Sequence, residues 1–193
     1  MLRTATVHRE TKETQIELQL SLDGGKIAID TGIGFFDHML CAFAHHAGFG
    51  LILKVRGDLF IDCHHTIEDT GIVLGKAITQ ALSDKKGISR FGTAFVPMDE
   101  SLGFCSLDIS GRNFLVFDAQ FPQEKIGDYD TCMTEEFFRA VADNSAITLH
   151  LKCEYGKNSH HITESLFKAF AHAMKRAVKI DSSIDILSTK GVL

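Results

Sequence analysis

The pentapeptide His-His-Thr-Ile-Glu at positions 64–68 is repeated in pattern by His-His-Ile-Thr-Glu at positions 160–164. Each copy of His-His-x-x-Glu opens an apolar stretch with helical spacing. Six metal-binding side chains at matching spacing indicate two metal ions held by two related halves of one chain. A single His-His pair at a helix start is usually a surface or capping feature, but two copies with the same glutamate offset favour metal binding.

The predicted elements follow a similar order in the two halves of the chain. A strand over 15–22 is predicted from alternation, and Asp-Gly-Gly at 23–25 predicts a hairpin turn to a partner strand over 26–30. The first half also contains a predicted helix over 35–47, a strand over 51–55 and a helix over 66–82. The second half contains predicted strands over 104–109, 114–117 and 147–153, a turn at 110–111, and helices over 134–142 and 162–178, the last capped by Ser159. We therefore expect a single domain of two pseudo-symmetric repeats, about 1–92 and 93–193, because each half alone would have a thin core.

Composition limits the function classes. The chain has 193 residues, and Lys+Arg 20 against Asp+Glu 25 gives a net charge of -5, which argues against a general nucleic-acid partner. No apolar run reaches the length of a transmembrane helix, and the N-terminal residues do not resemble a signal peptide. The five cysteines are odd in number, widely spaced and without Cys-x-x-Cys, which favours reduced thiols and a cytoplasmic location.

Helix geometry divides the ligands of each motif. The first histidine and the glutamate are four residues apart, so they share one helix face and can hold one ion. The second histidine, His65 or His161, points about 100° away. We therefore expect each second histidine to complete the site of the other motif. His38 is a candidate fourth ligand for the site of His160, and its counterpart Glu136 is a candidate for the site of His64.

The types of ligand atom limit which metal ions the sites would bind. Imidazole and carboxylate donors suit Mn, Fe, Co or Zn better than Ca or Mg. Cys63 lies beside the first motif, but a small buried thiol is a more common role for such a residue than a ligand.

The whole chain resembles the imidazoleglycerol-phosphate dehydratase family. The matching stretches are 9–14, 34–40, 64–69, 90–92, 97–100, 110–112, 159–164 and 188–193. The resemblance implies an α+β fold of the ribosomal protein S5 domain 2-like type, with tandem half-domains whose antiparallel or mixed sheets are backed by helices. It also implies a hollow homo-oligomer of twenty-four subunits, active sites between subunits, and two Mn²⁺ ions per site.

The family pattern assigns the metal ligands in agreement with the spacing. It places one ion on His38, His65, His160 and Glu164, and the other on His64, Glu68 and His161. Many members carry a histidine as the fourth ligand of the second ion, where this chain has Glu136.

The implied reaction removes water from imidazoleglycerol phosphate to give imidazole-acetol phosphate, a step of histidine biosynthesis. Two ions on the ring nitrogens would favour an imidazolate and position the ring. Glu13 is the first candidate for general acid/base catalysis, against the alternative of a solvated carboxylate at a strand end. Glu164 and His65 complete the implied catalytic set. Further substrate contacts are expected from His38, His46 and Asp99, although Asp99 could equally be a turn carboxylate.

The phosphate requires cationic donors. The resemblance assigns this role to Arg90, Arg112, Lys168, Ser188 and Lys190. Two alternatives stay open: a dinuclear metallohydrolase acting on a phosphate ester, and a non-enzymatic metal-storage assembly. The product distinguishes the enzymes, because hydrolysis releases free phosphate and dehydration leaves a phosphorylated ketone.

Overall fold

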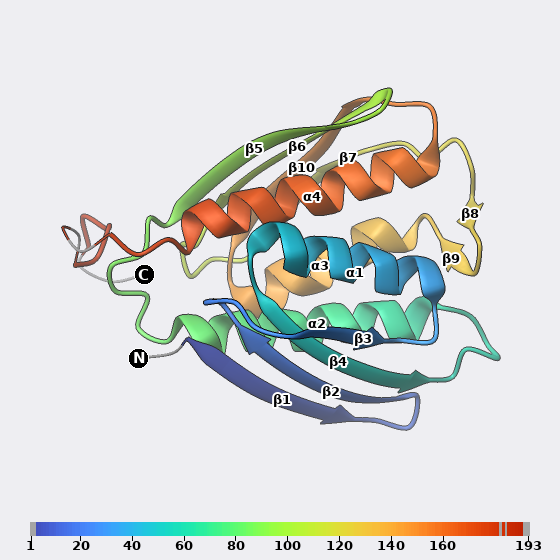
Figure 1. Cartoon of the computed structure of the whole chain (residues 1–193), viewed down its shortest axis with the longest axis horizontal. Helices are drawn as coiled ribbons and strands as arrows, with labels where there is room; N and C mark the ends of the chain where they lie inside the picture. The colour runs from blue at the N-terminus through green and yellow to red at the C-terminus, as the bar shows by residue number, and fades with distance from the viewer. Residues whose placement is uncertain (1–2, 182, 184, 191–193) are drawn as a thin grey trace.

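The computed structural model describes residues 3–181, 183 and 185–190, and its elements run through the same series twice (Figure 1). The first half contains β1 (Thr4–Glu10), β2 (Thr14–Ser21), β3 (Ile27–Asp30), α1 (Gly34–Ala47), β4 (Gly50–Gly57) and α2 (His64–Leu82). The second contains β5 (Phe91–Met98), β6 (Ser101–Asp108), β7 (Phe114–Asp118), α3 (Met133–Ser145), β10 (Thr148–Tyr155) and α4 (Ser159–Ala177). A short hairpin of β8 (Lys125–Ile126) and β9 (Tyr129–Asp130) is the one addition to the second series.

Each half forms a four-stranded mixed sheet with the same topology. The strand orders are β1-β2-β4-β3 and β5-β6-β10-β7. In both sheets the first two neighbouring pairs are antiparallel and the last pair is parallel. The predicted α+β class is therefore confirmed.

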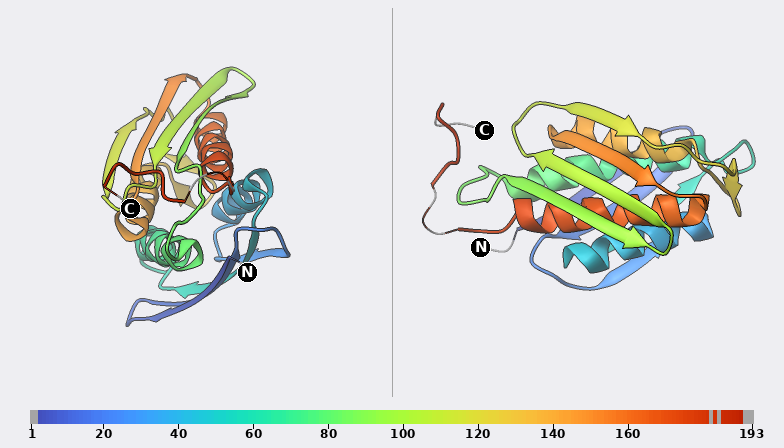
Figure 2. Two further views of the ribbon diagram at one scale, coloured as in Figure 1. Left: turned by 90° about the vertical axis from the view of Figure 1, so that its left-hand side faces the viewer. Right: turned by 90° about the horizontal axis from the view of Figure 1, so that it is seen from above.

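The four helices lie between the two sheets (Figures 1 and 2). α2 packs on β1 and β2, and α4 packs on β5 and β6, while α1 pairs with α4 and α2 pairs with α3. Each helix pair therefore joins the two halves. All four helices begin at the same end of the molecule, to the right in Figure 1, and this common end carries both His-His-x-x-Glu motifs.

Aromatic residues from both halves share one hydrophobic core. Phe43 stacks on Phe170 with ring centroids 5.2 Å apart, and Phe36 meets Phe137 edge-on at 5.3 Å. Because these contacts join α1 to α4 and α1 to α3, the halves bury their apolar faces against each other. The duplication with a boundary near residue 92 stays a prediction, and that boundary falls inside β5.

Several sequence-based predictions of local structure are wrong. β3 does not pair with β2 but runs parallel to β4, because β2 already has β1 and β4 on its two edges. The strands β1 and β5 were not predicted, because their buried positions carry few or small apolar side chains, such as Ala5 and Val7 in β1 and Ala94 in β5. The strands β6 and β7 lie on either side of the predicted turn at 110–111, and β10 separates them in the sheet.

The predicted cap of α4 is also wrong. Ser159 is the first residue of the helix, and Asn158 is the N-cap, whose Oδ1 accepts from the backbone N–H of His160 at 2.9 Å. Ser159 Oγ instead donates to the carbonyl of Gln123 at 3.1 Å.

Among the described residues, no helix is long and apolar enough to cross a membrane.

Candidate active site

Three predicted ligands meet where α1 and α4 begin side by side. His38, His160 and Glu164 present ligand atoms that all lie within 4.8 Å of one another. The Oε2 atom of Glu164 lies 3.3 Å from Nε2 of His160 and 3.8 Å from Nε2 of His38. His38 belongs to the first half and the other two to the second, so the helix pair builds a cluster that neither half contains.

Glu164 is held in its ionised form. Its side chain is 8% exposed, and burial alone would raise its pKa. A hydrogen bond from Lys168, whose Nζ lies 2.7 Å from Oε1, instead holds the pKa of Glu164 below its usual value. The other carboxylate oxygen, Oε2, faces the two histidines. Lys168 therefore lies on the same face of α4 as the cluster, as its spacing predicts.

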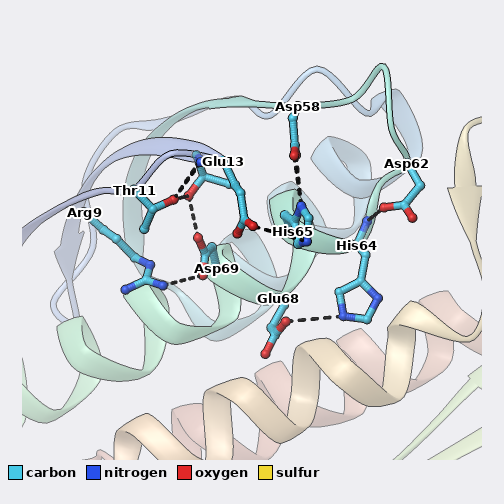
Figure 3. A network of polar contacts seen from close by, with 10 residues as sticks. Arg9, Thr11, Glu13, Asp58, Asp62, His64, His65, Glu68 and Asp69 are labelled. Carbon is cyan, nitrogen blue, oxygen red and sulfur yellow. Dashed lines mark hydrogen bonds and ion pairs between the residues drawn. The ribbon is translucent and has the colours of Figure 1, made fainter.

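The first motif forms a matching pair on α2. His64 Nε2 lies 3.3 Å from Glu68 Oε2, and both side chains point toward α3 (Figure 3). Glu136 on α3 is half-buried, and its Oε2 lies 3.7 Å from Arg139 Nε. Within the described part of the chain, no group of three ligands gathers around His64, so the geometry of Glu136 leaves its predicted role open.

The second histidine of each motif points away from the first, as the helical spacing predicts, and neither joins the three-ligand cluster. His65 Nδ1 lies 3.0 Å from Asp58 Oδ2 (Figure 3), and His161 Nδ1 lies 2.6 Å from Glu100 Oε2. These hydrogen bonds raise the pKa of both histidines. The contact with His161 also lowers the pKa of Glu100 to about 2. The contacts of Asp58 and Glu100 were not predicted from the sequence. Asp58 lies only 7 residues before His65, but Glu100 is 61 residues from His161 in the chain, so no local pattern links that pair.

Glu13 lies at the tip of the β1–β2 hairpin, beside the first motif. Its Oε1 is 3.8 Å from Nε2 of His65, and the side chain is exposed. Thr11 Oγ1 shapes the tip by accepting from the backbone N–H groups of Glu13 and Thr14, at 3.1 and 3.0 Å. Asp69 on α2 then accepts from Thr14 Oγ1, so the hairpin is fixed to the helix (Figure 3). A solvated carboxylate at a fixed position near a candidate ligand fits proton transfer.

Other candidates occupy distinct places. His46, at the end of α1, lies against His172 with ring centroids 5.3 Å apart, and burial, followed by the charge of Lys168, lowers its pKa. Asp99 lies in the β5–β6 turn with a φ of 48°, in the left-handed region, and its Oδ2 is 3.7 Å from His161 Nε2. Cys63 is buried, with its Sγ 3.4 Å from Asp130.

The candidate phosphate-binding arginines gather at the opposite end of the molecule, where α4 ends. Arg90 donates to both oxygens of Asp108, at 2.6 and 3.0 Å, and Arg112 lies 3.8 Å from the same carboxylate. Arg90 Nη1 also donates to the carbonyl of Leu187 at 2.6 Å, which places Ser188 next to this group. Lys190 follows in the exposed tail.

A long helix separates these arginines from the metal cluster. The backbone N–H of Arg90 donates to the carbonyl of Ala177, the last residue of α4, whereas His160 is near the first. α4 has 19 residues and is therefore about 28 Å long. Within one chain, the arginines and the cluster are too far apart to contact the same small substrate.

The profile of the imidazoleglycerol-phosphate dehydratase family matches residues 31–174. Two relatives of that name, from Clostridium kluyveri and Streptococcus gordonii, are 54% and 55% identical over 194 residues, with full coverage of both chains in each case. The crystal structure of the Staphylococcus aureus dehydratase superposes with a TM-score of 0.85 at 40% identity, covering 92% of this chain and 99% of that one. The Pyrococcus furiosus structure gives a TM-score of 0.85 at 36% identity, covering 97% and 100%.

The two mixed sheets enclosing four helices, with paired histidine–glutamate motifs at one end, therefore define a dehydratase of the α+β class. The chain belongs to the imidazoleglycerol-phosphate dehydratase family. Its activity is that of a hydro-lyase of histidine biosynthesis, which dehydrates imidazoleglycerol phosphate. The alternative of a metallohydrolase is not favoured, because these relatives are dehydratases.

Proposed function

We propose that this dehydratase works with two Mn²⁺ ions in each active site. The observation that carries the proposal is the cluster of His38, His160 and Glu164, with ligand atoms within 4.8 Å and one buried, ionised carboxylate. Two imidazole nitrogens and a carboxylate oxygen form a donor set that suits Mn²⁺. His65 completes this set. The second set consists of His64, Glu68, Glu136 and His161.

We infer that neighbouring copies complete each active site, in an assembly of 24 subunits. The separation along α4 supports this, because the imidazole ring and phosphate of the substrate are joined by only a few bonds and span less than about 10 Å. An exposed apolar loop of Leu59, Phe60 and Ile61 lies just before the first motif, and Phe60 is 90% exposed. Exposed apolar groups of this size favour burial against another chain.

Each group of residues has a separate task in the proposed reaction. Bound to the ring nitrogens, the two ions would supply positive charge that favours the imidazolate form of the ring. Glu13, at its fixed hairpin tip, moves the proton at the carbon beside the ring, and Glu164 and His65 hold the site that orients the ring. We assign further substrate contacts to His38, His46 and Asp99.

The phosphate is bound by charge and by hydrogen bonds. Arginine offers paired donors to phosphate oxygens, and Asp108 holds Arg90 and Arg112 near each other. The set that we assign to the phosphate consists of Arg90, Arg112, Lys168, Ser188 and Lys190. A cytoplasmic location fits the five cysteines, all of which are free thiols.

Anaerobic metal analysis combined with a lyase assay on the intact particle tests the proposal. We expect two Mn²⁺ ions per chain in fully active protein and a phosphorylated ketone as product. Fewer than two ions per chain at full activity would contradict the two-ion site. Release of free phosphate would instead indicate hydrolysis.

A further inference from the structure

We propose that Asp58 and Glu100 are positioning residues, which hold His65 and His161 in the tautomer that offers Nε2 to a metal ion. This inference rests on the two metal sites of the proposed function. It concerns the orientation of the two histidines that stand outside the three-ligand cluster.

Asp58 is itself firmly held. Its two oxygens lie 3.2 and 3.0 Å from Nδ1 of His65, and its side chain is 10% exposed (Figure 3). The backbone N–H of Asp58 donates to the carbonyl of Glu13 at 3.1 Å, and its own carbonyl accepts from Ile61 at 2.8 Å. The carboxylate is therefore fixed between the β1–β2 hairpin and the loop that leads into α2.

Glu100 lies in the β5–β6 turn and is held in a comparable way by the loop that precedes α4. Its Oε2 lies 2.6 Å from Nδ1 of His161, and its Oε1 accepts from the backbone N–H groups of Lys157 and Asn158 at 3.1 and 2.9 Å. The two backbone donors anchor one oxygen and leave the other directed at the ring. His161 is thus oriented by a carboxylate that is tied to the loop preceding its own helix.

The chemistry of these contacts selects the tautomer. An ionised carboxylate can only accept hydrogen bonds, so the Nδ1 atom that faces it must carry the proton. In a neutral imidazole this leaves the lone pair on Nε2, which is the atom free to bind a metal. Carboxylates that accept from a ligating histidine in this way orient the ring and make it a stronger ligand.

Among the described residues, the hydrogen bonds of both rings are made by Nδ1, and none is made by Nε2. Glu13 and Asp99 are the nearest carboxylates there, at 3.8 and 3.7 Å, which is beyond hydrogen-bond distance. Their side chains are 53% and 73% exposed, in contrast to the anchored partners at Nδ1. Within the part of the chain that the structure describes, each second histidine therefore has a hydrogen-bonded Nδ1 and an Nε2 without a hydrogen bond.

Duplication alone does not account for the shared geometry. Asp58 follows β4, whereas Glu100 lies in the β5–β6 turn, and these are not equivalent places in the two halves. Two different backbone positions place a carboxylate on the same ring atom. A common requirement at the histidine explains this better than inheritance of one loop.

The proposal is tested by Asp58→Asn and Glu100→Gln in the full chain. An amide can donate as well as accept, so either variant permits the wrong tautomer. After metal removal, Mn²⁺ is titrated back and the free ion is followed by electron paramagnetic resonance. We expect each variant to bind Mn²⁺ about 10–100-fold more weakly. The matched controls Asp84→Asn and Glu154→Gln, at exposed carboxylates that pair with lysines, should bind as the parent does.

A double-mutant cycle separates positioning from a general structural role. If Asp58 acts through His65, Asp58→Asn should cause no further loss of Mn²⁺ affinity in a His65→Ala background, and the same holds for Glu100 with His161. Equal losses in both backgrounds would overturn the proposal, as would parent-like affinity of the single carboxylate variants. If His65→Ala and His161→Ala bind Mn²⁺ like the parent, the proposed metal sites themselves are wrong. If Asp58→Asn does not fold, the variants of Glu100 and His161 still test the proposal. Glu100 lies in an exposed turn, so we expect Glu100→Gln to fold.

Discussion

The Nε2 atom of His38 on α1 lies 3.8 Å from Oε2 of Glu164 on α4, so the two halves of the chain contribute to one candidate metal site. The contact exists because α1 and α4 pack side by side and begin at the same end of the molecule (Figure 1). The Lys168 ammonium on the far oxygen of Glu164 keeps this buried carboxylate ionised, so it is ready to accept a cation.

Replacement of that carboxylate should remove metal. We expect Glu164→Gln to weaken Mn²⁺ binding at least about tenfold, because a neutral amide replaces a charged ligand. Metal content after dialysis measures the effect. Lys168→Met is the comparison, since it removes the ion pair and keeps the ligand, and it should retain more metal than Glu164→Gln. The reverse order would mean that Glu164 serves only to bind Lys168.

A substitution of Glu13 should impair proton transfer without affecting metal binding. The variant Glu13→Gln should lower the lyase turnover about 10²–10⁴-fold, the usual contribution of a general acid or base, while Mn²⁺ content stays at the parent level. Glu10→Gln, on the same hairpin and also exposed, is the matched control and should stay active. Full activity of Glu13→Gln would remove Glu13 from the mechanism.

The C-terminal tail should contribute to phosphate binding. Deletion of residues 187–193 removes Ser188, Lys190 and the carbonyl that accepts from Arg90. Since a hydrogen bond to a charged group contributes about 1.5–3 kcal/mol, the Michaelis constant should rise about tenfold or more. Steady-state kinetics with the parent chain as reference measure the change. An unchanged Michaelis constant together with unchanged turnover would contradict the assignment.

The close approach of α2 and α3 should be sensitive to side-chain size. A Cβ on Gly71 would lie 2.8 Å from the carbonyl oxygen of Phe137 and from Cβ of Ala140. Gly71→Val should therefore push the helices apart and lower the free energy of unfolding by about 1–3 kcal/mol, as overpacking does. Chemical denaturation of the metal-free protein measures this. Gly34→Ala, where a Cβ meets nothing within 4 Å, is the control. Parent-like stability of Gly71→Val would show that the helix pair can adjust.

The stability of the metal-free protein should depend on pH through His172. Burial, followed by the charges of Lys175 and Arg176, lowers the pKa of His172 below 6.5. The unfolded chain therefore takes up this proton at a higher pH than the folded chain does. The free energy of unfolding must then fall as the pH decreases through 6.5 toward the folded-state pKa.

His172→Gln should reduce that loss, because the variant has no histidine to protonate at this position. Denaturant midpoints at several pH values between about 7 and 5 measure the difference, given the usual histidine titration range. His150→Gln, at an exposed position on β10, is the comparison. If both variants lose stability with pH as the parent does, burial of His172 is not the cause.

The sequence by itself determined the local chemistry of the site. Helical spacing places His160 and Glu164 on one face, and the contact between their ligand atoms at 3.3 Å follows from that periodicity alone. The divergence of His65 and His161 from their neighbours follows from the same geometry. Alternation or helical periodicity located β2 and the four helices, because each buries one face against the core.

Only the tertiary structure decided which separate segments meet. The pairing of β3 with β4, the contact of His38 with Glu164 and the bond between Glu100 and His161 all join residues that are distant in the chain. Side-chain periodicity reports which face of an element is buried, but not which element covers it. Packing of α1 on α4 and of α2 on α3 made that choice, and it placed the ligands of two halves at one end of the molecule.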